Sequence, residues 1–370
     1  MAPDFSKRTA DTLAKRAAYL CSNPDCRTST VGPNSVEKEA TIIGEAAHIY
    51  AARAGEARYE AQITDQAKSE ISNGIWLCRN CHRQVDRDGK KFPAVLLFRW
   101  REQHEEFVAS NLGSQSDKAR YEIAKHALAQ FDGYPPLIRR IAYDKPPGWE
   151  WGLSAALMRH LNAPLFRSLS DVRDGVRAIQ IEFLDDDEVM NWVSERTQEM
   201  AEMVEPLAKI LDRINKAWGE PGQPGDVDEI HHSALLLRDS LAQIVRYEER
   251  LYSVRVSPKF GELVGLLRNA LGSQAEKFKQ TPDRLDKIVE MAIRAVDAGP
   301  SDEPIIVQET IEFTLPNGWS DDFNRAIRRI EKRSIGSMFA DGFRESDTRN
   351  PGCLSAFFIV LAIVILFRVL

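Results

Sequence analysis

Two cysteine pairs and two histidines give the first part of this chain residue types that bind metals and move protons. Cys21 and Cys26 form one pair, and Cys78 and Cys81 form another about fifty residues later. Each pair can bend back to present two thiolates, and two such pairs complete a tetrahedral zinc site with no position left for substrate. The spacing therefore predicts a structural Zn²⁺ ion, whose binding supplies folding free energy to this segment.

The two histidines are left for chemistry by this assignment. His48 lies in an apolar, β-branched run from Thr41 to Ile49 that is typical of a strand, and a strand would hold the imidazole rigidly. Histidine accepts a proton near neutral pH, so His48 is the predicted general base. A histidine satisfied in the core is the alternative for this position.

His82 directly follows the last cysteine of the pair, at the expected start of a helix that runs through Val85. There a ring nitrogen can face a second, catalytic divalent cation, which stabilises charge on a phosphoryl group and on its leaving oxygen. Asn73, shortly before Cys78, carries an amide that can orient the base. The alternative for Asn73 is a turn, which an Asn-Gly pair favours.

The order of these residues resembles that of the HNH endonucleases, the ββα-metal group of nucleases. The resemblance covers roughly residues 9 to 110 and rests on four segments, which are Gly44–Ile49, Ala57–Tyr59, Asn73–His82 and Val85–Asp86. It points most to the branch found in bacterial defence and restriction proteins. The resemblance implies that His48 is the general base, that Asn73 is the middle residue of the triad, and that His82 binds a divalent metal, usually Mg²⁺.

One position departs from the family pattern. Many members carry an acidic metal ligand directly before the catalytic histidine, where this chain has Ala47. Glu45 is the nearest acid, but a residue three positions before His48 points to the opposite face of a regular strand. We therefore expect Glu45 to reach the metal only through a bulge.

Four further polar residues near the motif receive roles. Arg53 and Arg58 follow the predicted catalytic strand and are candidates for contacts to nucleic-acid phosphate, with a solvated loop as the alternative. Asp86, one helical turn after His82, is expected to cap or support it. His104 belongs to a predicted helix, where packing is the expected role.

Composition limits the partners. The chain has 370 residues, 43% of them apolar, which is enough for two or three domains. Its net charge of −6 argues against a broad basic surface, so contact with DNA is expected to be local to the nuclease groove. Five cysteines, four of them in metal spacing, indicate a reducing cytoplasm rather than a disulfide framework.

The rest of the chain predicts mainly helices and shows no catalytic motif. The expected helices lie near residues 200–214, 228–251, 260–271 and 284–296. The first two form an antiparallel pair around the breaker Gly219–Gly225, and Ile305–Phe313 is the best strand candidate outside the nuclease. We interpret this region as a sensor, scaffold or oligomerisation element that serves a homo-oligomer or a regulatory partner.

The C-terminal segment predicts a membrane anchor. Leu354–Phe367 is apolar except for one serine, and with the last three residues it approaches the length that spans a bilayer. A basic cluster between Arg325 and Arg333 is typical of the cytoplasmic side of a membrane. The sequence therefore predicts a single-pass tail anchor in the inner membrane with the nuclease in the cytoplasm, and a buried core helix is the alternative.

Together these features predict an α+β chain with an N-terminal zinc-stapled ββα-metal (HNH) nuclease domain, a mostly α-helical middle region and one C-terminal transmembrane helix. The expected nuclease, loop-rich linker, helical region and anchor occupy residues 1–112, 113–152, 153–350 and 353–370. The expected function is metal-dependent hydrolysis of phosphodiester bonds in DNA, in defence against phage or other foreign DNA. The alternatives are a zinc-stapled nucleic-acid-binding module and a membrane scaffold, both without cleavage activity.

Overall fold

The computed structural model describes residues 4–112, 128–220, 223–270, 272–298, 305–313, 315–340 and 361–369. The chain divides into two units. The first contains Met1–Leu153 and Asp286–Ala298, and the second contains Ser154–Leu285 and Gly299–Leu370. Residues 113–127 of the predicted linker at 113–152 lie outside the described residues.

An antiparallel hairpin followed by a helix forms the centre of the first unit. β3 (Gly44–His48) pairs with β4 (Gly74–Cys78) in unbroken register, with His48 opposite Gly74. α3 (Arg79–Arg87) follows β4 directly, because the Cys78 sulfur caps the helix by accepting the N–H of Cys81 at 3.5 Å. α3 contacts both strands, so the strand expected around His48 and the helix expected at His82 lie together.

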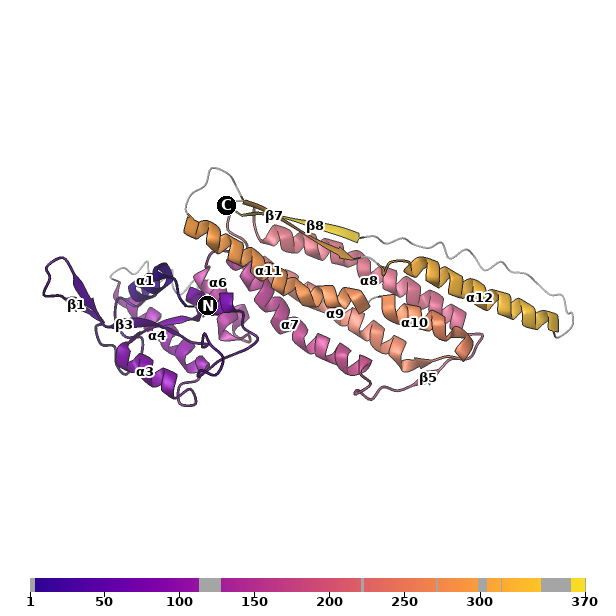
Figure 1. Ribbon diagram of the computed structural model, residues 1–370, viewed down its shortest axis with the longest axis horizontal. Helices are drawn as coiled ribbons and strands as arrows, with labels where there is room; N and C mark the ends of the chain where they lie inside the picture. The colour runs from indigo at the N-terminus through magenta and orange to yellow at the C-terminus, as the bar shows by residue number, and fades with distance from the viewer. Residues whose placement is uncertain are drawn as a thin grey trace. The chain divides into compact units, whose positions relative to one another are not determined.

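Two helices cover the two faces of this hairpin, and Figure 1 shows α1 and α3 on opposite sides of β3. α1 (Lys7–Arg16) packs around the Trp76 indole through Leu13, Ala14 and Ala17. Side chains alternate along a strand, so Ala46 packs on the α1 side with Trp76, whereas Glu45 faces α3 and contacts His82. The alternation thus decides which side chains α3 can meet.

Short elements complete the first unit. β1 (Val31–Pro33) and β2 (Ala40–Ile42) form a second two-stranded sheet. The hairpin is flanked by α2 (Asp65–Ser69), η1 (Ile71–Asn73), α4 (Ala94–Asn111), η2 (Ala129–Phe131) and α6 (Pro136–Asp144). α6 lies within the segment predicted to be a loop-rich linker. Its paired prolines begin the helix, because the fixed φ of proline suits the first helical turn.

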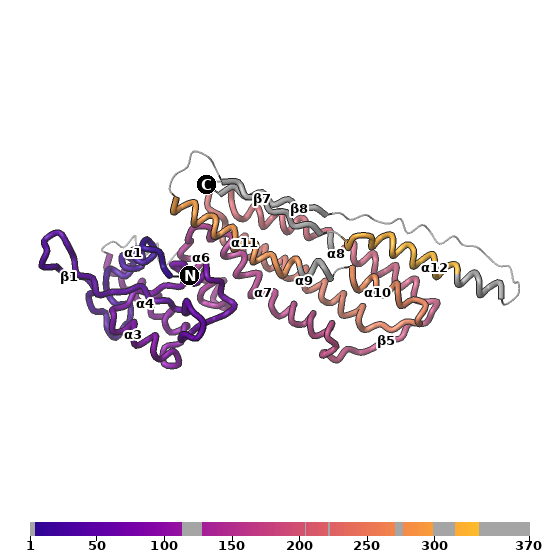
Figure 2. Tube along the Cα trace, viewed as in Figure 1, coloured from indigo at the N-terminus to yellow at the C-terminus, as the bar shows by residue number. Residues whose placement is uncertain are grey.

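Long helices make up most of the second unit (Figure 1). They are α7 (Trp149–Arg173), α8 (Val189–Ala217), α9 (Val227–Ser253), α10 (Gly261–Ala270), α11 (Gly272–Ala298) and α12 (Trp319–Ala340). The start of α7, up to Leu153, and the second half of α11, Asp286–Ala298, belong to the first unit. α8 and α9 run side by side, which confirms the predicted helical pair (Figure 2). Short elements also occur, namely β5 (Glu182–Phe183), β6 (Val254–Arg255) and η3 (Pro258–Phe260).

The predicted C-terminal anchor is wrong. β7 (Ile305–Phe313) confirms the strand expected there, and its antiparallel partner is β8 (Leu361–Val369), which is the last part of the predicted span. Among the described residues, no helix combines the length and the apolar character needed to cross a membrane. Residues 341–360, which include the start of the predicted span, lie outside the described residues.

The predicted fold class is corrected accordingly. The described residues are mostly helical, with small two-stranded sheets, and lack the transmembrane helix on which the inner-membrane localisation rested. The physical reason is that an apolar run such as Ile363–Leu366 is typical both of a β-strand and of a membrane-spanning segment. Its β-branched residues suit a strand as well as its hydropathy suits a membrane span.

Candidate metal centre and histidine site

Four thiols converge where β4 meets α3. The Sγ atoms of Cys21, Cys26, Cys78 and Cys81 all lie within 4.8 Å of one another, and those of Cys26 and Cys78 are 3.9 Å apart. Tetrahedral zinc with Zn–S bonds of about 2.3 Å needs sulfur atoms about 3.8 Å apart. The cluster therefore has the ligand set and the spacing to bind a metal ion such as zinc.

A tight turn presents the first cysteine pair. The backbone N–H groups of Cys26 and Arg27 both donate to the Asn23 carbonyl, at 2.9 and 3.0 Å, and Arg27 adopts a left-handed φ of 42°. The Asn23 side-chain Nδ2 donates to Cys81 Sγ at 3.3 Å. Such a donor stabilises a metal-bound thiolate from outside the ligand set, so the turn also serves the second pair.

Burial disfavours the thiolate forms of the clustered cysteines. It raises the pKa of Cys21, which is fully buried, above its usual range, and it raises the pKa of Cys81 to about 11. Burial also disfavours the Cys78 thiolate, but hydrogen bonds from the Cys81 N–H and from the neighbouring thiols lower the pKa of Cys78. A bound divalent cation would supply the positive charge that four buried thiolates require.

His82 lies between two carboxylates on the α3 side of the hairpin. Its Nδ1 is 2.7 Å from Glu45 Oε2, and its Nε2 is 3.1 Å from Asp86 Oδ2. The hydrogen bond with Asp86 raises the pKa of His82, burial opposes this rise, and Glu45 adds to it. Glu45 reaches His82 from a regular strand, because α3 lies on the face to which Glu45 points, and its contact with a metal stays a prediction.

His48 ends β3, and its ring stacks on a residue that precedes α1. The ring centroids of His48 and Phe5 are 4.0 Å apart and the ring planes differ by 10°. Phe5 therefore fixes the plane of the predicted base. No local pattern around the motif signals Phe5, which lies far away in the sequence.

Arg58 ties the end of β3 to α3. Its side chain is only 4% exposed, and its φ of 66° is left-handed. Nε donates to the Ile49 carbonyl at 2.8 Å and Nη1 donates to the Val85 carbonyl. Nη2 donates both to the His48 carbonyl, at 3.3 Å, and to Asp86 Oδ1, at 3.0 Å.

These contacts give Arg58 an internal role, and the phosphate contact expected from the sequence stays a prediction. One nitrogen touches the backbone of His48 and the side chain of Asp86. The strand end that carries the predicted base and the helix edge that carries His82 are therefore adjacent.

Asn73 is fully buried and fixes the backbone that follows His48. Its Oδ1 accepts the N–H of Tyr50 at 2.8 Å, and its Nδ2 donates to the carbonyls of Tyr50 and Lys68, each at 2.9 Å. Its backbone carbonyl accepts the N–H of Ile49 at 2.8 Å. Asn73 thus holds the backbone of Ile49 and Tyr50, the two residues that follow the predicted base His48.

The two remaining candidate residues, Arg53 and His104, make few contacts that bear on their predicted roles. Arg53 is exposed, and its guanidinium has no hydrogen bond or ion pair within the described part of the chain, so its contact with phosphate stays a prediction. His104 is 1% exposed, and its Nε2 lies 3.1 Å from the Ala17 carbonyl. Burial lowers the pKa of His104, and the packing role expected for it is confirmed.

A buried ionic network beneath the hairpin was not apparent from the sequence. Arg101 Nη1 donates to the carbonyls of Ile71 and Gly74, at 2.6 and 2.8 Å, on either side of Asn73. Arg101 also pairs with Glu105 and Asp144. The residues come from α4 and α6, so only the tertiary fold brings them together.

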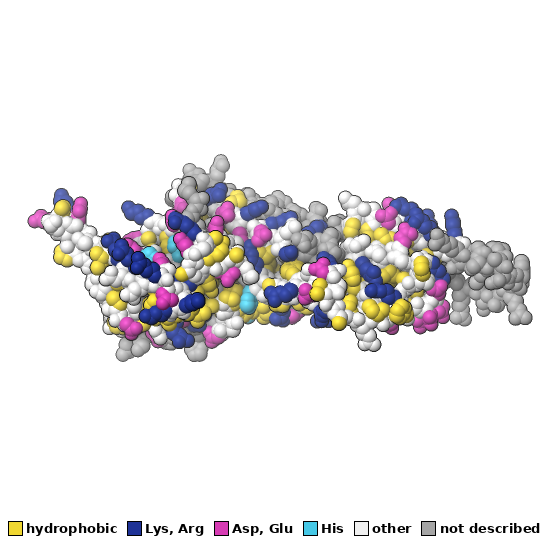
Figure 3. Space-filling view, turned by 60° about the horizontal axis from the view of Figure 1, so that its bottom comes forward, with side chains coloured by type: hydrophobic (Ala, Val, Ile, Leu, Met, Phe, Trp, Pro, Cys, Tyr) yellow, Lys and Arg dark blue, Asp and Glu magenta, His cyan; other side chains and the backbone are white. Residues whose placement is uncertain are grey.

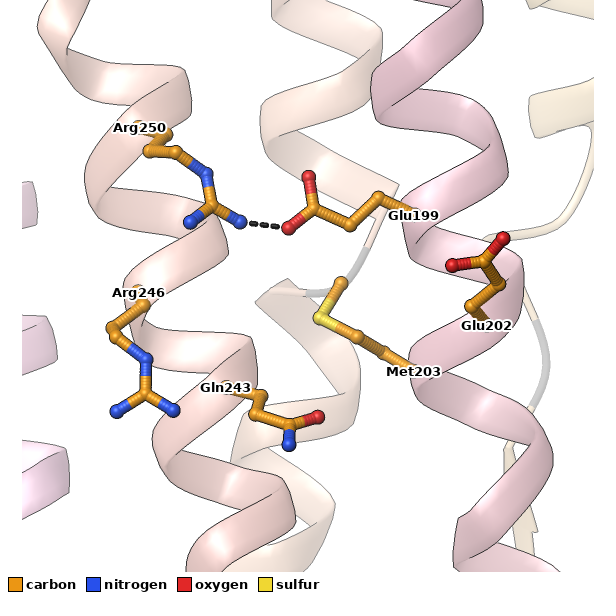
Figure 4. Close-up of a pocket in the computed structure, with 6 residues that line it drawn as sticks. All are labelled: Glu199, Glu202, Met203, Gln243, Arg246 and Arg250. Atoms are coloured by element: carbon orange, nitrogen blue, oxygen red, sulfur yellow. Dashed lines mark hydrogen bonds and ion pairs between the residues drawn. The ribbon is translucent and has the colours of Figure 1, made fainter.

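The second unit contains a shallow polar pocket between α8 and α9 (Figure 4). Glu199 and Arg250 form an ion pair across it, and its other lining residues are Glu202, Met203, Gln243 and Arg246. Two acids and two arginines balance in charge. The charges that line this pocket therefore do not indicate any particular class of ligand.

Comparisons of the chain with protein-family models, with curated proteins and with solved structures found no match. A four-cysteine cluster occurs in many unrelated folds. The function is therefore argued from the arrangement of the site rather than from relatives.

Proposed function

We propose that this chain is a metal-dependent endonuclease of the HNH type that hydrolyses phosphodiester bonds in DNA. The observation that carries the proposal is the contact of Arg58 Nη2 with both the His48 carbonyl and Asp86 Oδ1. It supports a site at the junction of the strand end and the metal-binding edge on α3, with the backbone of His48 beside that edge and the His48 ring on the α1 face of β3, stacked on Phe5. The four cysteines support it further, because they would staple the junction of β4 and α3 from which His82 projects.

His82 Nε2 and Asp86 Oδ2 would hold the divalent cation. Their separation of 3.1 Å suits neighbouring ligands of a cation with bonds of about 2.1 Å. Glu45 Oε2 then accepts the N–H of Nδ1 and orients the ring. When bound, Mg²⁺ or another divalent cation stabilises the charge on the phosphate and on the 3′ leaving oxygen.

His48 takes a proton from the attacking water at a ring nitrogen. A general base works best when its position is fixed, and three contacts fix this one: the Phe5 ring, Arg58 at the His48 carbonyl, and Asn73 at the next residues of the chain. The family resemblance implies a product with a 5′ phosphate.

Nicking of supercoiled plasmid by the full chain with Mg²⁺ tests the proposal. We expect His48→Ala to lower the rate by about 10² to 10⁴-fold, the usual contribution of a general base. His232→Ala is the matched control, because His232 is exposed on α9 in the second unit. Zinc content, measured for all three proteins, shows that the four-cysteine centre is intact.

The alternative is a zinc-stapled module that binds nucleic acid without cutting it. Binding of DNA without nicking, across Mg²⁺, Mn²⁺ and Co²⁺, would favour that alternative. Equal nicking by the parent and by His48→Ala would remove His48 as the base and overturn the mechanism.

For the biological role we propose defence against incoming foreign DNA, which rests on the sequence resemblance alone. Phage plating on cells that express the parent or His48→Ala tests it. Equal plating on both would count against a defensive nuclease.

A further inference from the structure

An arginine stripe runs along the exposed face of α3. Arg79, Arg83 and Arg87 recur every fourth residue, so they span about 12 Å along the helix and turn by only about 80° around it. All three are exposed. The Arg79 Nε donates to Glu45 Oε1 at 2.9 Å, whereas Arg83 and Arg87 have no hydrogen bond or ion pair within the described ranges.

The three arginines of the stripe repel one another, which lowers the stability of the protein on its own. Like charges four residues apart on a helix repel each other, each pair costing a few tenths of a kcal/mol. Arg79 is also the first residue of α3, where the helix dipole disfavours a cation. The nearby acids are already engaged, since Glu45 contacts His82 and Arg79, and Asp86 contacts His82 and Arg58. Arg83 thus has no acidic partner in the part of the first unit that the structure describes, and Arg87 is favoured only by the helix dipole in the last turn of α3.

The stripe lies beside the edge of α3 that carries His82 and Asp86. At about 100° per residue, those two side chains lie within about 60° of Arg79 around the helix. Figure 3 shows Lys and Arg side chains gathered on one face of the first unit, at the left of the view. In a chain with net charge −6, such a local surface is the place where a polyanion binds.

We propose that Arg79, Arg83 and Arg87 bind the phosphate backbone of duplex DNA along one strand. This inference rests on the proposed nuclease function and names the surface that receives its substrate. Each DNA strand carries one phosphate per about 3.4 Å of helix axis, and because the strand winds around that axis its neighbouring phosphates are farther apart than this, so a stripe of about 12 Å can contact two to three phosphates in succession. Guanidinium groups bind phosphate oxygens in pairs, and a strand held on the stripe passes beside the edge formed by His82 and Asp86.

Salt dependence of binding tests the stripe. The full chain carries His48→Ala to prevent cleavage, and its affinity for a fluorescent 20-base-pair duplex is measured by anisotropy between 50 and 200 mM KCl. Each lost phosphate contact lowers the slope of log affinity against log salt by about 0.9. We expect Arg83→Gln with Arg87→Gln to lower the slope by about 1.8, equally for two unrelated sequences, because phosphate contacts do not read bases.

The matched control makes the same charge change elsewhere. Arg167 and Arg328 are exposed in the second unit and have no ionic partner in the part of the chain that the structure describes, so Arg167→Gln with Arg328→Gln leaves the slope unchanged. Zinc content shows that the substitutions keep the fold. Arg79 is left in place because its substitution also disturbs Glu45.

The outcomes separate the stripe from the nuclease. An unchanged slope for the Arg83 and Arg87 variant, with plasmid nicking by the parent intact, overturns the stripe alone. A lowered slope without any nicking supports the stripe and overturns the nuclease in favour of a binding module. A slope change seen only with duplex RNA of the same sequence overturns DNA as the occupant, and absence of both binding and nicking overturns both proposals.

Discussion

Replacement of Arg58 by glutamine should loosen the first unit more than any exposed substitution. The change removes a guanidinium that is 4% exposed and donates to the carbonyls of Ile49, Val85 and His48. Glutamine is too short to replace these bonds and carries no charge. The backbone at residue 58 stays left-handed, at a φ of 66°, so the substitution does not relieve that strain.

The structure sets the size of the effect. The bonds to Ile49 and Val85 are buried and charge-assisted, and each is worth about 1.5 to 3 kcal/mol. The contact with His48, at 3.3 Å, is long, and the ion pair with Asp86 is discounted because that carboxylate is 54% exposed. Water that enters the site offsets part of the loss, so we expect the free energy of unfolding to fall by about 3 kcal/mol, roughly 150-fold in the unfolding equilibrium.

Zinc release reports on the first unit specifically, because all four cysteines belong to it. The urea dependence of release is followed with a coloured zinc chelator for the parent, for Arg58→Gln and for Arg53→Gln. Arg53 precedes Arg58 in the same loop and is exposed, so its substitution should change stability by less than about 0.5 kcal/mol. Coincident curves for the two variants would show that the Arg58 contacts do not hold β3 to α3.

Three further substitutions test other parts of the first unit. Cys26→Ser should abolish stoichiometric zinc binding and unfold the first unit while the α8 and α9 pair keeps its helical circular dichroism; full zinc content would contradict the four-cysteine centre. Burial raises the pKa of Glu70 to about 7, so its contribution to stability is lost as pH rises from about 4.5 to 7. Glu70→Gln should therefore stabilise the unit by about 3 kcal/mol at pH 8 relative to pH 4.5, and a pH-independent difference would refute this. Asp144→Asn should cost about 3 to 5 kcal/mol, because it removes one of the two buried carboxylates that Arg101 and Arg140 share; a loss below 1 kcal/mol in the zinc-release assay would contradict the network.

The cysteine cluster could be predicted from the sequence because its chemistry allows few arrangements. Two close pairs in a chain with one other cysteine leave little choice but a common site, and all four thiols meet. The helical pair α8 and α9 was predictable for a similar reason, since apolar residues at helical spacing must face a common core. In both cases the spacing of the residues in the sequence is enough to predict which side chains meet.

Roles that depend on burial or on neighbouring elements could not be predicted. Arg58 follows the strand in a polar loop, and nothing in the sequence shows that its side chain turns inward to reach α3. Strand alternation correctly predicted that Glu45 points away from the face of His48, but nothing in the sequence showed that α3 lies on the Glu45 face. The segment Leu361–Val369 was misjudged because hydropathy does not distinguish an apolar strand from part of a membrane span.

The boundary of the first unit follows from its buried charges. Glu105 on α4 is almost fully buried, and although burial opposes its ionisation, Arg140, Arg101 and Arg16 hold the pKa of Glu105 far below its usual range. Two of these arginines belong to α1 and α4, but Arg140 comes from α6, as does the fully buried Asp144.

A unit that ended at residue 112, as the sequence suggested, would leave Glu105 and Arg101 without those partners. Glu105 would keep Arg101 and Arg16, but the loss of a partner from a buried ionic network is strongly destabilising. Because Arg101 also holds the carbonyls on either side of Asn73, the loss would reach the backbone beside His48. The candidate site therefore requires α6, a helix that contributes no residue to the chemistry.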